Sequence, residues 1–165
     1  MYEIITTNIN DLTCESSLLR QVSKDVDVSD IVQYNGLVRE MNRILLDSGH
    51  GTGMSAIQIG IPIRLFIINM SRIDMPEIVA INPKVISITG RMTERLEGCL
   101  SLPNYHGKVR RRNKIQFSAY DLTGAMNTYQ FAGYTAAVIQ HEFDHLDGIL
   151  YWDRMDDGDK PNTRG

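Results

Sequence analysis

The sequence is short of the features that mark secreted, membrane-spanning and nucleic-acid-binding proteins. Two cysteines in 165 residues, Cys14 and Cys99, are too few for a disulfide framework, and we expect both to be reduced. The longest apolar run, Leu65 to Ile68, has the length of a strand and not of a membrane span. The net charge of −3 argues against general nucleic-acid binding, and we expect no contact with a membrane.

Targeting signals are also missing. The first residues, MYEIITTNIND, have neither the basic start and apolar core of a signal peptide nor the Arg-rich character of a transit peptide. We therefore expect a cytoplasmic, bacterial-style protein. Its length fits a single domain over residues 1–165, and we expect a monomer. The acidic stretch after Trp152, which contains Gly and Pro, predicts a mobile tail over residues 153–165.

The chemistry that the sequence does carry is concentrated in QHEFDHLDG, residues 140–148. His141 and His145 are four residues apart, and on a helix this spacing places both imidazoles on one face, close enough to share a metal ion. Glu142 projects about 100° away around the helix, outside the ligand pair but within reach of a metal-bound water. This arrangement indicates hydrolysis by a metal-activated water. The alternative is a pair of core histidines that bind no metal.

A helix is expected here because residues 136–140 lead into the motif without a helix breaker, and Gly133 and Gly148 stand at its two ends. At about 100° per residue, three further side chains share the histidine face: Tyr134, Ala137 and Val138. We expect these side chains to line a cavity beside the metal. Three apolar side chains on the opposite face predict that the helix is buried: Ile139, Phe143 and Leu146.

The remaining pattern predicts one more helix and several strands. An amphipathic helix is expected from Ser29-Asp30 to Ser48-Gly49, because apolar residues recur at three- and four-residue steps. Strands are expected over residues 63–70, 77–81 and 85–89, the second of them closed at Asn82-Pro83, and a hairpin over residues 114–120 and 127–131. Five basic residues before this hairpin are expected in a solvated loop or on a rim that attracts anionic groups: Lys108, Arg110, Arg111, Arg112 and Lys114.

A catalytic metal held by two histidines needs a third protein ligand and one open position. Downstream of the motif, the candidates are Asp147, Asp153 and Asp156. A zinc endopeptidase would use one of them. Upstream, Cys99 in the segment EGCLS offers a thiolate, a strong ligand for divalent transition metals, and the alternative is a buried apolar cysteine. A closed structural zinc site would need a fourth ligand, and the other candidates stand alone in the sequence: Cys14, His50 and His106.

The glycine-rich stretch GTGMSAIQIG, residues 51–60, lets the backbone run close to a ligand. It lacks the Gly-Lys-Ser/Thr of a phosphate-binding loop. Gln58 is the side chain here that can both donate and accept hydrogen bonds near a ligand. The alternative for Gln58 is a surface or backbone-bonded amide.

GTGMSAIQIG, EGCLS and QHEFDHLDG together resemble, in order and spacing, the three signature motifs of the peptide deformylases, over residues 15–152. The resemblance implies an α+β fold, with antiparallel sheets packed around a central metal-binding helix that carries the HExxH motif. The amphipathic helix expected earlier in the chain would be its N-terminal helix. The implied metal ligands are Cys99, His141 and His145. The resemblance further implies Glu142 as the acid–base group, with Gln58 and the backbone N–H of Leu100 stabilising an oxyanion.

The same resemblance implies a substrate and a cofactor. The substrate would be the N-terminal formyl-methionine of nascent polypeptides, with formate released. Gly53 and Gly98 are placed for backbone hydrogen bonds to an extended peptide, and Tyr134, Ala137 and Val138 for lining the methionine pocket. One divalent metal ion is expected, Fe²⁺ in the cell, with Zn²⁺, Ni²⁺ or Co²⁺ possible in purified protein.

Three departures from the family pattern stand out. Ser55 stands where alanine is usual, a small change that we expect to be tolerated. His106 stands where a basic residue, often arginine, is common, which affects substrate contacts beyond the first residue. The chain ends 20 residues after His145, where many bacterial members continue into a C-terminal helix. It therefore resembles minimal members, including phage-encoded ones that work in a bacterial host cytoplasm, and ribosome contact lacks the support of that helix.

Overall fold

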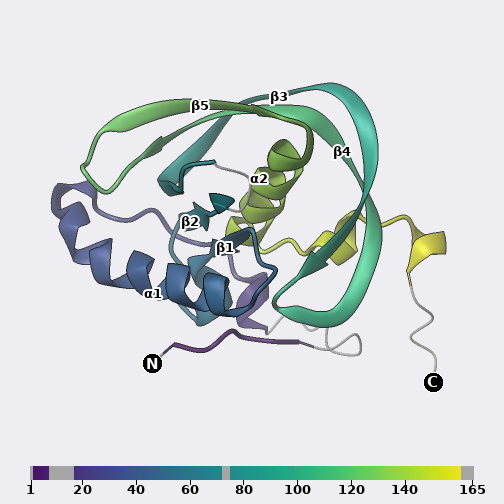
Figure 1. Ribbon diagram of the computed structural model, residues 1–165, viewed down its shortest axis with the longest axis horizontal. Coiled ribbons are helices and arrows are strands. Elements are labelled where there is room, and N and C mark those ends of the chain that lie inside the picture. The colour runs from purple at the N-terminus through teal and green to yellow at the C-terminus, as the bar shows by residue number, and fades with distance from the viewer. Residues whose placement is uncertain (1, 8–16, 72–74, 161–165) are drawn as a thin grey trace.

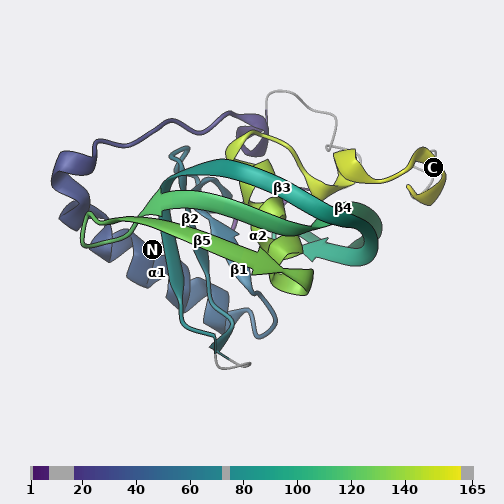
Figure 2. The ribbon, with the colours of Figure 1, turned by 90° about the horizontal axis from the view of Figure 1, so that it is seen from above.

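The fold is a curved antiparallel sheet with one helix enclosed in its curve and a second helix outside it (Figures 1 and 2). The computed structural model describes residues 2–7, 17–71 and 75–160. The sheet has the order β1-β2-β3-β4-β5, and every neighbouring pair is antiparallel. Its strands are β1 (Gly53–Ser55), β2 (Leu65–Ile68), β3 (Ile78–Cys99), β4 (Leu102–Tyr120) and β5 (Met126–Ala132). The α-helices are α1 (Asn35–Asp47) and α2 (Gly133–Leu146). Short 3₁₀ segments occur at other places in the described chain.

Strand β2 is buried on both faces and separates the two α-helices. Its side chains point alternately to opposite faces of the sheet, as in any strand. Phe66 belongs to a cluster with Phe117 of β4 and Phe143 of α2, whose rings meet in tilted and edge-to-face pairs. Leu65 and Ile67 belong to the second cluster, which includes the buried stripe of α1. The prediction of antiparallel sheets is confirmed in its strand direction, but the described strands form one sheet and not several.

The longest strand, β3, corrects the predicted strand boundaries. The sequence pattern divided this region at Asn82-Pro83 and again at Gly90, but the backbone continues through both as a single strand. The pairing with β4 shifts between Ile81 and Lys84, which is a β-bulge. Asn82 takes a φ of 47° there, and its side chain accepts from the N–H of Val26 at 2.9 Å and donates to the Val26 carbonyl at 2.8 Å. The turn-forming residues therefore bend the strand without ending it.

The amphipathic helix begins later than predicted. Residues Val28–Tyr34 form a 3₁₀ segment interrupted at Asp30, and α1 starts at Asn35. The cap is Asp27 and not Ser29, because the Asp27 carboxylate accepts a hydrogen bond from the Ser29 N–H at 2.9 Å. The predicted apolar stripe is confirmed by its buried members: Val38, Met41, Ile44 and Leu45.

The hairpin and the second helix lie where the sequence placed them. Strands β4 and β5 pair around a turn in which the Asp121 carboxylate accepts from the N–H groups of Thr123 and Ala125, at 2.8 and 3.2 Å. Helix α2 follows β5 directly, and both flanking glycines have positive φ, 66° at Gly133 and 71° at Gly148. Glycine adopts this conformation without the strain that a Cβ would bring. In the part of the chain that the structure describes, no helix is long and apolar enough to cross a membrane.

The prediction of a mobile tail over residues 153–165 is wrong for its first three residues. Asp153 forms an ion pair with Arg20, Arg154 pairs with Asp144 of α2 at 2.8 Å, and Met155 is buried at 5% exposure. Met155 also makes a β-bridge with Val109 of β4 and belongs to a small apolar cluster with Leu102 and Tyr151, among others. Residues 156–159 are exposed, and residues 161–165 lie outside the described ranges. The docked part of the chain therefore extends to Met155.

Two truncations test this boundary. A chain ending at Met155 should unfold within a few degrees of the full chain, because the residues removed bury little surface. A chain ending at Trp152 should lose much more, since deleting the side chain of one buried methionine alone costs about 2–5 kcal/mol. Thermal unfolding of the three chains measures the difference. Equal losses for both truncations would contradict the docking of Asp153–Met155.

Candidate metal centre and active site

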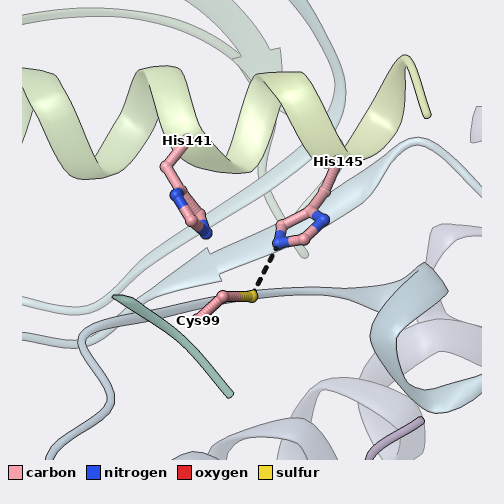
Figure 3. Close-up of side chains that lie close together, drawn as sticks. All are labelled: Cys99, His141 and His145. Atoms are coloured by element: carbon pink, nitrogen blue, oxygen red, sulfur yellow. Dashed lines mark hydrogen bonds between the residues drawn. The ribbon is translucent and has the colours of Figure 1, made fainter. Parts of the chain in front are cut away.

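Three side chains that could bind a metal ion come from distant parts of the sequence and meet between β3 and α2. Cys99 ends β3, and His141 and His145 project from one face of α2 toward it (Figure 3). Their ligand atoms all lie within 4.8 Å of one another, and Cys99 Sγ is 3.2 Å from His145 Nε2. One thiol and two imidazoles at this spacing form a donor set suited to a divalent transition metal.

The electrostatics of the cluster favour the thiolate. Burial alone raises the pKa of the Cys99 thiol, but the charge of His145 and hydrogen bonds from both histidines outweigh it. The pKa of Cys99 is therefore lowered well below its usual value. Because the thiolate is the form of cysteine that binds metals, the residues present fit a metal ion. Cys14, which we expect to be reduced, lies outside the described residues.

A buried carboxylate fixes the orientation of the first histidine. His141 Nδ1 lies 3.0 Å from Glu97 Oε2, so a proton on Nδ1 leaves the Nε2 lone pair available for a metal. Glu97 is held in turn by Arg111, whose Nη2 donates to Glu97 Oε2 at 2.9 Å. Arg111 Nη1 reaches across to Asp144 Oδ2 on α2 at 2.8 Å. Sequence reasoning missed this network, although Glu97 is the first residue of EGCLS and Arg111 stands in the basic cluster.

The network keeps Glu97 ionised. Burial raises the pKa of the Glu97 carboxyl, but hydrogen bonds from His141 and Arg111 outweigh burial and lower that pKa to about 2. Arg111 itself is only 6% exposed and lies on β4, which corrects the expectation that the whole basic cluster lies in a solvated loop. The other four cations of the cluster are exposed on the same strand.

The downstream aspartates considered as a third ligand are engaged elsewhere. Asp147 Oδ1 lies 2.7 Å from Arg64 Nη1, and Asp153 binds Arg20 and the N–H of Leu150. Asp156 is exposed beyond the docked segment. Among the described residues, the group that gathers three metal-binding side chains is the one built on Cys99, which disfavours the endopeptidase alternative.

Glu142 follows His141 on α2 and is buried. It is 2% exposed, and burial raises the pKa of its carboxyl, although the charges of His141 and His145 and a hydrogen bond from Ser55 oppose this shift. The Ser55 hydroxyl donates to Glu142 Oε2 at 2.8 Å. A buried carboxyl group whose pKa is raised holds a proton more readily than an exposed one, which suits it to accept and return a proton.

Gln58 lies on the other side of the cluster and is also 2% exposed, so it is not a surface amide. Its Oε1 accepts from the N–H of Ser55 at 2.9 Å, which fixes the direction of the amide. Its Nε2 therefore points toward Cys99 Sγ at 3.4 Å and Ser101 Oγ at 3.2 Å. The 3₁₀ segment Ala56–Ile59 that carries Gln58 follows directly after β1, so the glycine-rich stretch positions the amide.

A cavity of about 510 Å³ opens onto these groups. Its wall includes every residue that the sequence assigned to substrate or oxyanion binding: Gly53, Gln58, Gly98, Leu100, Tyr134, Ala137 and Val138. Two of these positions leave no room for a side chain. A Cβ at Gly53 would lie 2.6 Å from Glu142 Oε1, and one at Gly98 would lie 2.8 Å from His106 Cδ2.

Comparison with known proteins places the chain in a family. The family model described as polypeptide deformylase matches residues 9–161. Peptide deformylase from Helicobacter pylori (strain G27) is 35% identical over 145 residues, which cover 85% of this chain and 82% of that protein. The chloroplastic peptide deformylase 1B of Solanum lycopersicum is 37% identical over 142 residues, 85% of this chain but 50% of the relative. This chain therefore spans about half the length of that plant relative.

Solved structures agree with the sequence relatives. A crystal structure of a point mutant of Arabidopsis thaliana peptide deformylase 1B superposes with a TM-score of 0.83 at 30% identity, covering 94% of this chain and 81% of the plant chain. The peptide deformylase of Thermotoga maritima gives a TM-score of 0.76 at 27% identity, covering 94% of this chain and 98% of its own. The shared motifs, the match of the family model and the common fold lead to one conclusion: this chain belongs to the peptide deformylase family.

Proposed function

We propose that this protein removes the formyl group from the N-terminal formyl-methionine of newly made polypeptides and releases formate. The observation that carries the proposal is the meeting of Cys99, His141 and His145 beside the buried carboxyl of Glu142, at the wall of a cavity. Hydrolysis of an amide needs an activated water, a group that moves its proton and a site for the developing oxyanion. The residues around this cavity can supply all three.

Cys99, His141 and His145 would hold one divalent metal ion. Such an ion, when bound, lowers the pKa of water and polarises a carbonyl oxygen. We propose Fe²⁺ as the ion used in the cell. Zn²⁺, Ni²⁺ or Co²⁺ can replace it in purified protein, because affinities for the same donor set rise from Fe²⁺ through Co²⁺ to Ni²⁺, with Zn²⁺ also bound tightly.

Glu142 acts as the acid–base group. It accepts a proton from the attacking water as the new C–O bond forms at the formyl carbon. It then gives this proton to the departing amine as the C–N bond breaks, which leaves formate and a free methionine amino group. The Gln58 amide and the backbone N–H of Leu100 donate hydrogen bonds to the oxygen that gains charge. Since Gln58 Nε2 already donates to Cys99 Sγ and Ser101 Oγ, one of these two contacts is exchanged or shared.

The cavity selects an unbranched apolar first residue. Tyr134, Ala137 and Val138 line the side of the cavity formed by α2, and they follow the helical spacing that leads to His141. We propose that they contact the methionine side chain. Gly53 lies on β1, at the edge of the sheet, where an extended peptide can add hydrogen bonds to a strand, and Gly98 faces the same cavity. The cytoplasm, where formylated nascent chains emerge, is the proposed compartment, with the protein acting as a monomer.

Replacing Cys99 tests the metal centre. Cys99→Ser should reduce the metal content of purified protein and the rate of formate release by more than about 10-fold, since even changes to outer groups around a metal cost 10–100-fold in affinity. Cys14→Ser is the matched control and should retain both. Metal analysis and formate release from a formyl-methionyl peptide are the two measurements. Normal metal content with normal turnover in Cys99→Ser would remove Cys99 from the ligand set and favour an endopeptidase.

Replacing Glu142 tests the acid–base role separately from metal binding. Glu142→Ala should retain the metal and lower kcat by at least about 10²–10⁴-fold, the usual contribution of a general acid–base group. Metal content is measured on the same samples used for formate release. If the metal is lost together with activity, Glu142 belongs to the ligand set or to the fold of the site. If formate release is absent in the unmodified, metal-loaded protein, the proposed function itself fails.

A further inference from the structure

Ser55 contacts both of the side chains to which the proposed reaction assigns proton transfer and oxyanion binding. Its N–H donates to Gln58 Oε1 at 2.9 Å, and its hydroxyl donates to Glu142 Oε2 at 2.8 Å. The residue is fully buried, so water does not compete for either bond. The backbone contact is available to any residue at this position, but the hydroxyl contact is available only to a residue such as serine.

The carboxyl of Glu142 lies against the three-residue strand β1, which binds one of its oxygens and leaves room for the other. On one side Oε1 lies over Gly53, where a Cβ would approach it to 2.6 Å. On the other side Oε2 receives the Ser55 hydroxyl. A carboxyl group on two rotatable bonds beyond its Cβ can otherwise turn about its own axis and present either oxygen in several directions. The absence of a Cβ at Gly53 admits the carboxyl to this position, and the Ser55 hydroxyl binds its Oε2 there.

We propose that Ser55 is a positioning residue for Glu142: its hydroxyl holds the carboxyl in the orientation that proton transfer requires. This inference rests on the proposed deformylase function and adds to it. The hydroxyl is the group that contacts the carboxyl, so a residue without a hydroxyl at this position would lose the contact. Its role is distinct from a simple strand-to-helix tie, although the hydroxyl also lies 3.2 Å from the Glu142 backbone oxygen. A hydroxyl has one proton, and the shorter contact is the one to the carboxyl.

Ser55→Ala separates the two roles. If the hydroxyl positions Glu142, kcat should fall about 10- to 100-fold, the size of a hydrogen bond to a charged group, with KM and metal content nearly unchanged. Ser23→Ala is the matched control, because Ser23 is also buried and its hydroxyl has no partner among the described residues. Ser23→Ala should leave kcat unchanged. An unchanged kcat in Ser55→Ala with full metal content would overturn the inference.

A double-mutant cycle identifies the residue through which Ser55 acts. In a Glu142→Ala background, Ser55→Ala should have no further effect on the residual kcat, because the group it positions is already gone. An equal fold-loss in both backgrounds would show that Ser55 acts on the structure and not through Glu142. If the unmodified, metal-loaded protein and all of its variants fail to release formate, the proposed function fails instead.

A second observation, independent of the first, concerns Arg95. Arg95 lies on β3 and lines the cavity, on the same strand face as Glu97, two residues away. It is half-buried, and its Nε is shielded from solvent without a hydrogen-bond partner among the described residues. The acidic side chains that line the cavity are engaged elsewhere: Glu97 with Arg111 and His141, and Glu142 with Ser55.

A shielded donor on a cation is costly unless a partner satisfies it. The nearby Arg111 meets this requirement with two carboxylates, whereas Arg95 forms no ion pair within residues 2–7, 17–71 and 75–160, the part of the chain that the structure describes. His50 and His106 line the same cavity and add no negative charge. The wall around Arg95 therefore suits a negatively charged group brought in by the ligand.

We infer that Arg95 makes the protein favour formyl-methionyl peptides with an acidic side chain close behind the methionine. The inference rests on the proposed function and names a substrate class for it. Two peptide pairs test it, formyl-Met-Glu-amide against formyl-Met-Gln-amide and formyl-Met-Ala-Glu-amide against formyl-Met-Ala-Gln-amide. Within each pair the side chains have nearly the same shape and differ in charge.

The ratio of kcat/KM for Glu over Gln is the quantity to compare. In the unmodified protein it should be about 2 to 5 for at least one pair, the size of a partly exposed charge contact, and Arg95→Met should bring it to about 1. Arg110→Met is the matched control, since Arg110 is exposed on β4 and its removal changes the net charge equally. Equal ratios in the unmodified protein and Arg95→Met at both positions would overturn the inference. If the protein releases formate from none of these peptides, the proposed function fails instead.

Discussion

The ion pairs of Arg111 join the two halves of the active site. Cys99 comes from the long β3–β4 hairpin and the histidines come from α2, so the site exists only where these elements are held in one register. Arg111 contacts Glu97 on β3 and Asp144 on α2, and all three side chains are at most 10% exposed. Removing one partner of such a buried pair leaves an uncompensated charge and costs about 3–5 kcal/mol. Such a pair contributes little net stability compared with well-packed apolar residues of similar volume.

The same charged contacts also orient His141, one of the side chains proposed to bind the metal. Glu97 is paired with Arg111 and also meets His141 Nδ1, so the residue that joins hairpin to helix is the one that orients an imidazole. Asp144 also binds Arg154, which brings the segment after α2 into the same network. The apolar contact of Phe66, Phe117 and Phe143 holds helix against sheet, but apolar packing is not directional and tolerates small shifts. The charged contacts are directional, and they determine how α2 is oriented against the β3–β4 hairpin.

The parts of the site that could be predicted from the sequence are those set by local spacing. The four-residue step from His141 to His145 fixes one helix face, and Gly133 and Gly148 mark the ends of that helix by their positive φ. The parts that could not be predicted depend on pairing across the sheet. Nothing in the basic cluster distinguishes Arg111 from Arg110 except the two-residue alternation along β4, and this alternation appears only once the strand is known to run from Leu102 to Tyr120.

Local turn signals failed for a related reason. Asn82-Pro83 has the composition of a turn, yet it forms a bulge because the Asn82 side chain satisfies the backbone of Val26, a residue 56 positions earlier. In the same way, the polarity of the segment after Trp152 predicted mobility, while the burial of Met155 depends on the space left by Gly107 on β4. Both errors come from tertiary contacts that overrule composition.

In the glycine-rich stretch, two residues of β1 shape the surroundings of the Glu142 carboxyl. Gly53 leaves room for Glu142, Ser55 binds both Glu142 and Gln58, and only one residue separates the two on β1. A loop without regular structure would let these positions move independently, but pairing with β2 fixes the backbone of all three residues of the strand. Because Gly53 and Ser55 are two residues apart, their side-chain directions point to the same face of the strand, which is the face toward α2. The Glu142 carboxyl is therefore contacted from the edge of the sheet, whereas His141 is contacted by Glu97 of the β3–β4 hairpin.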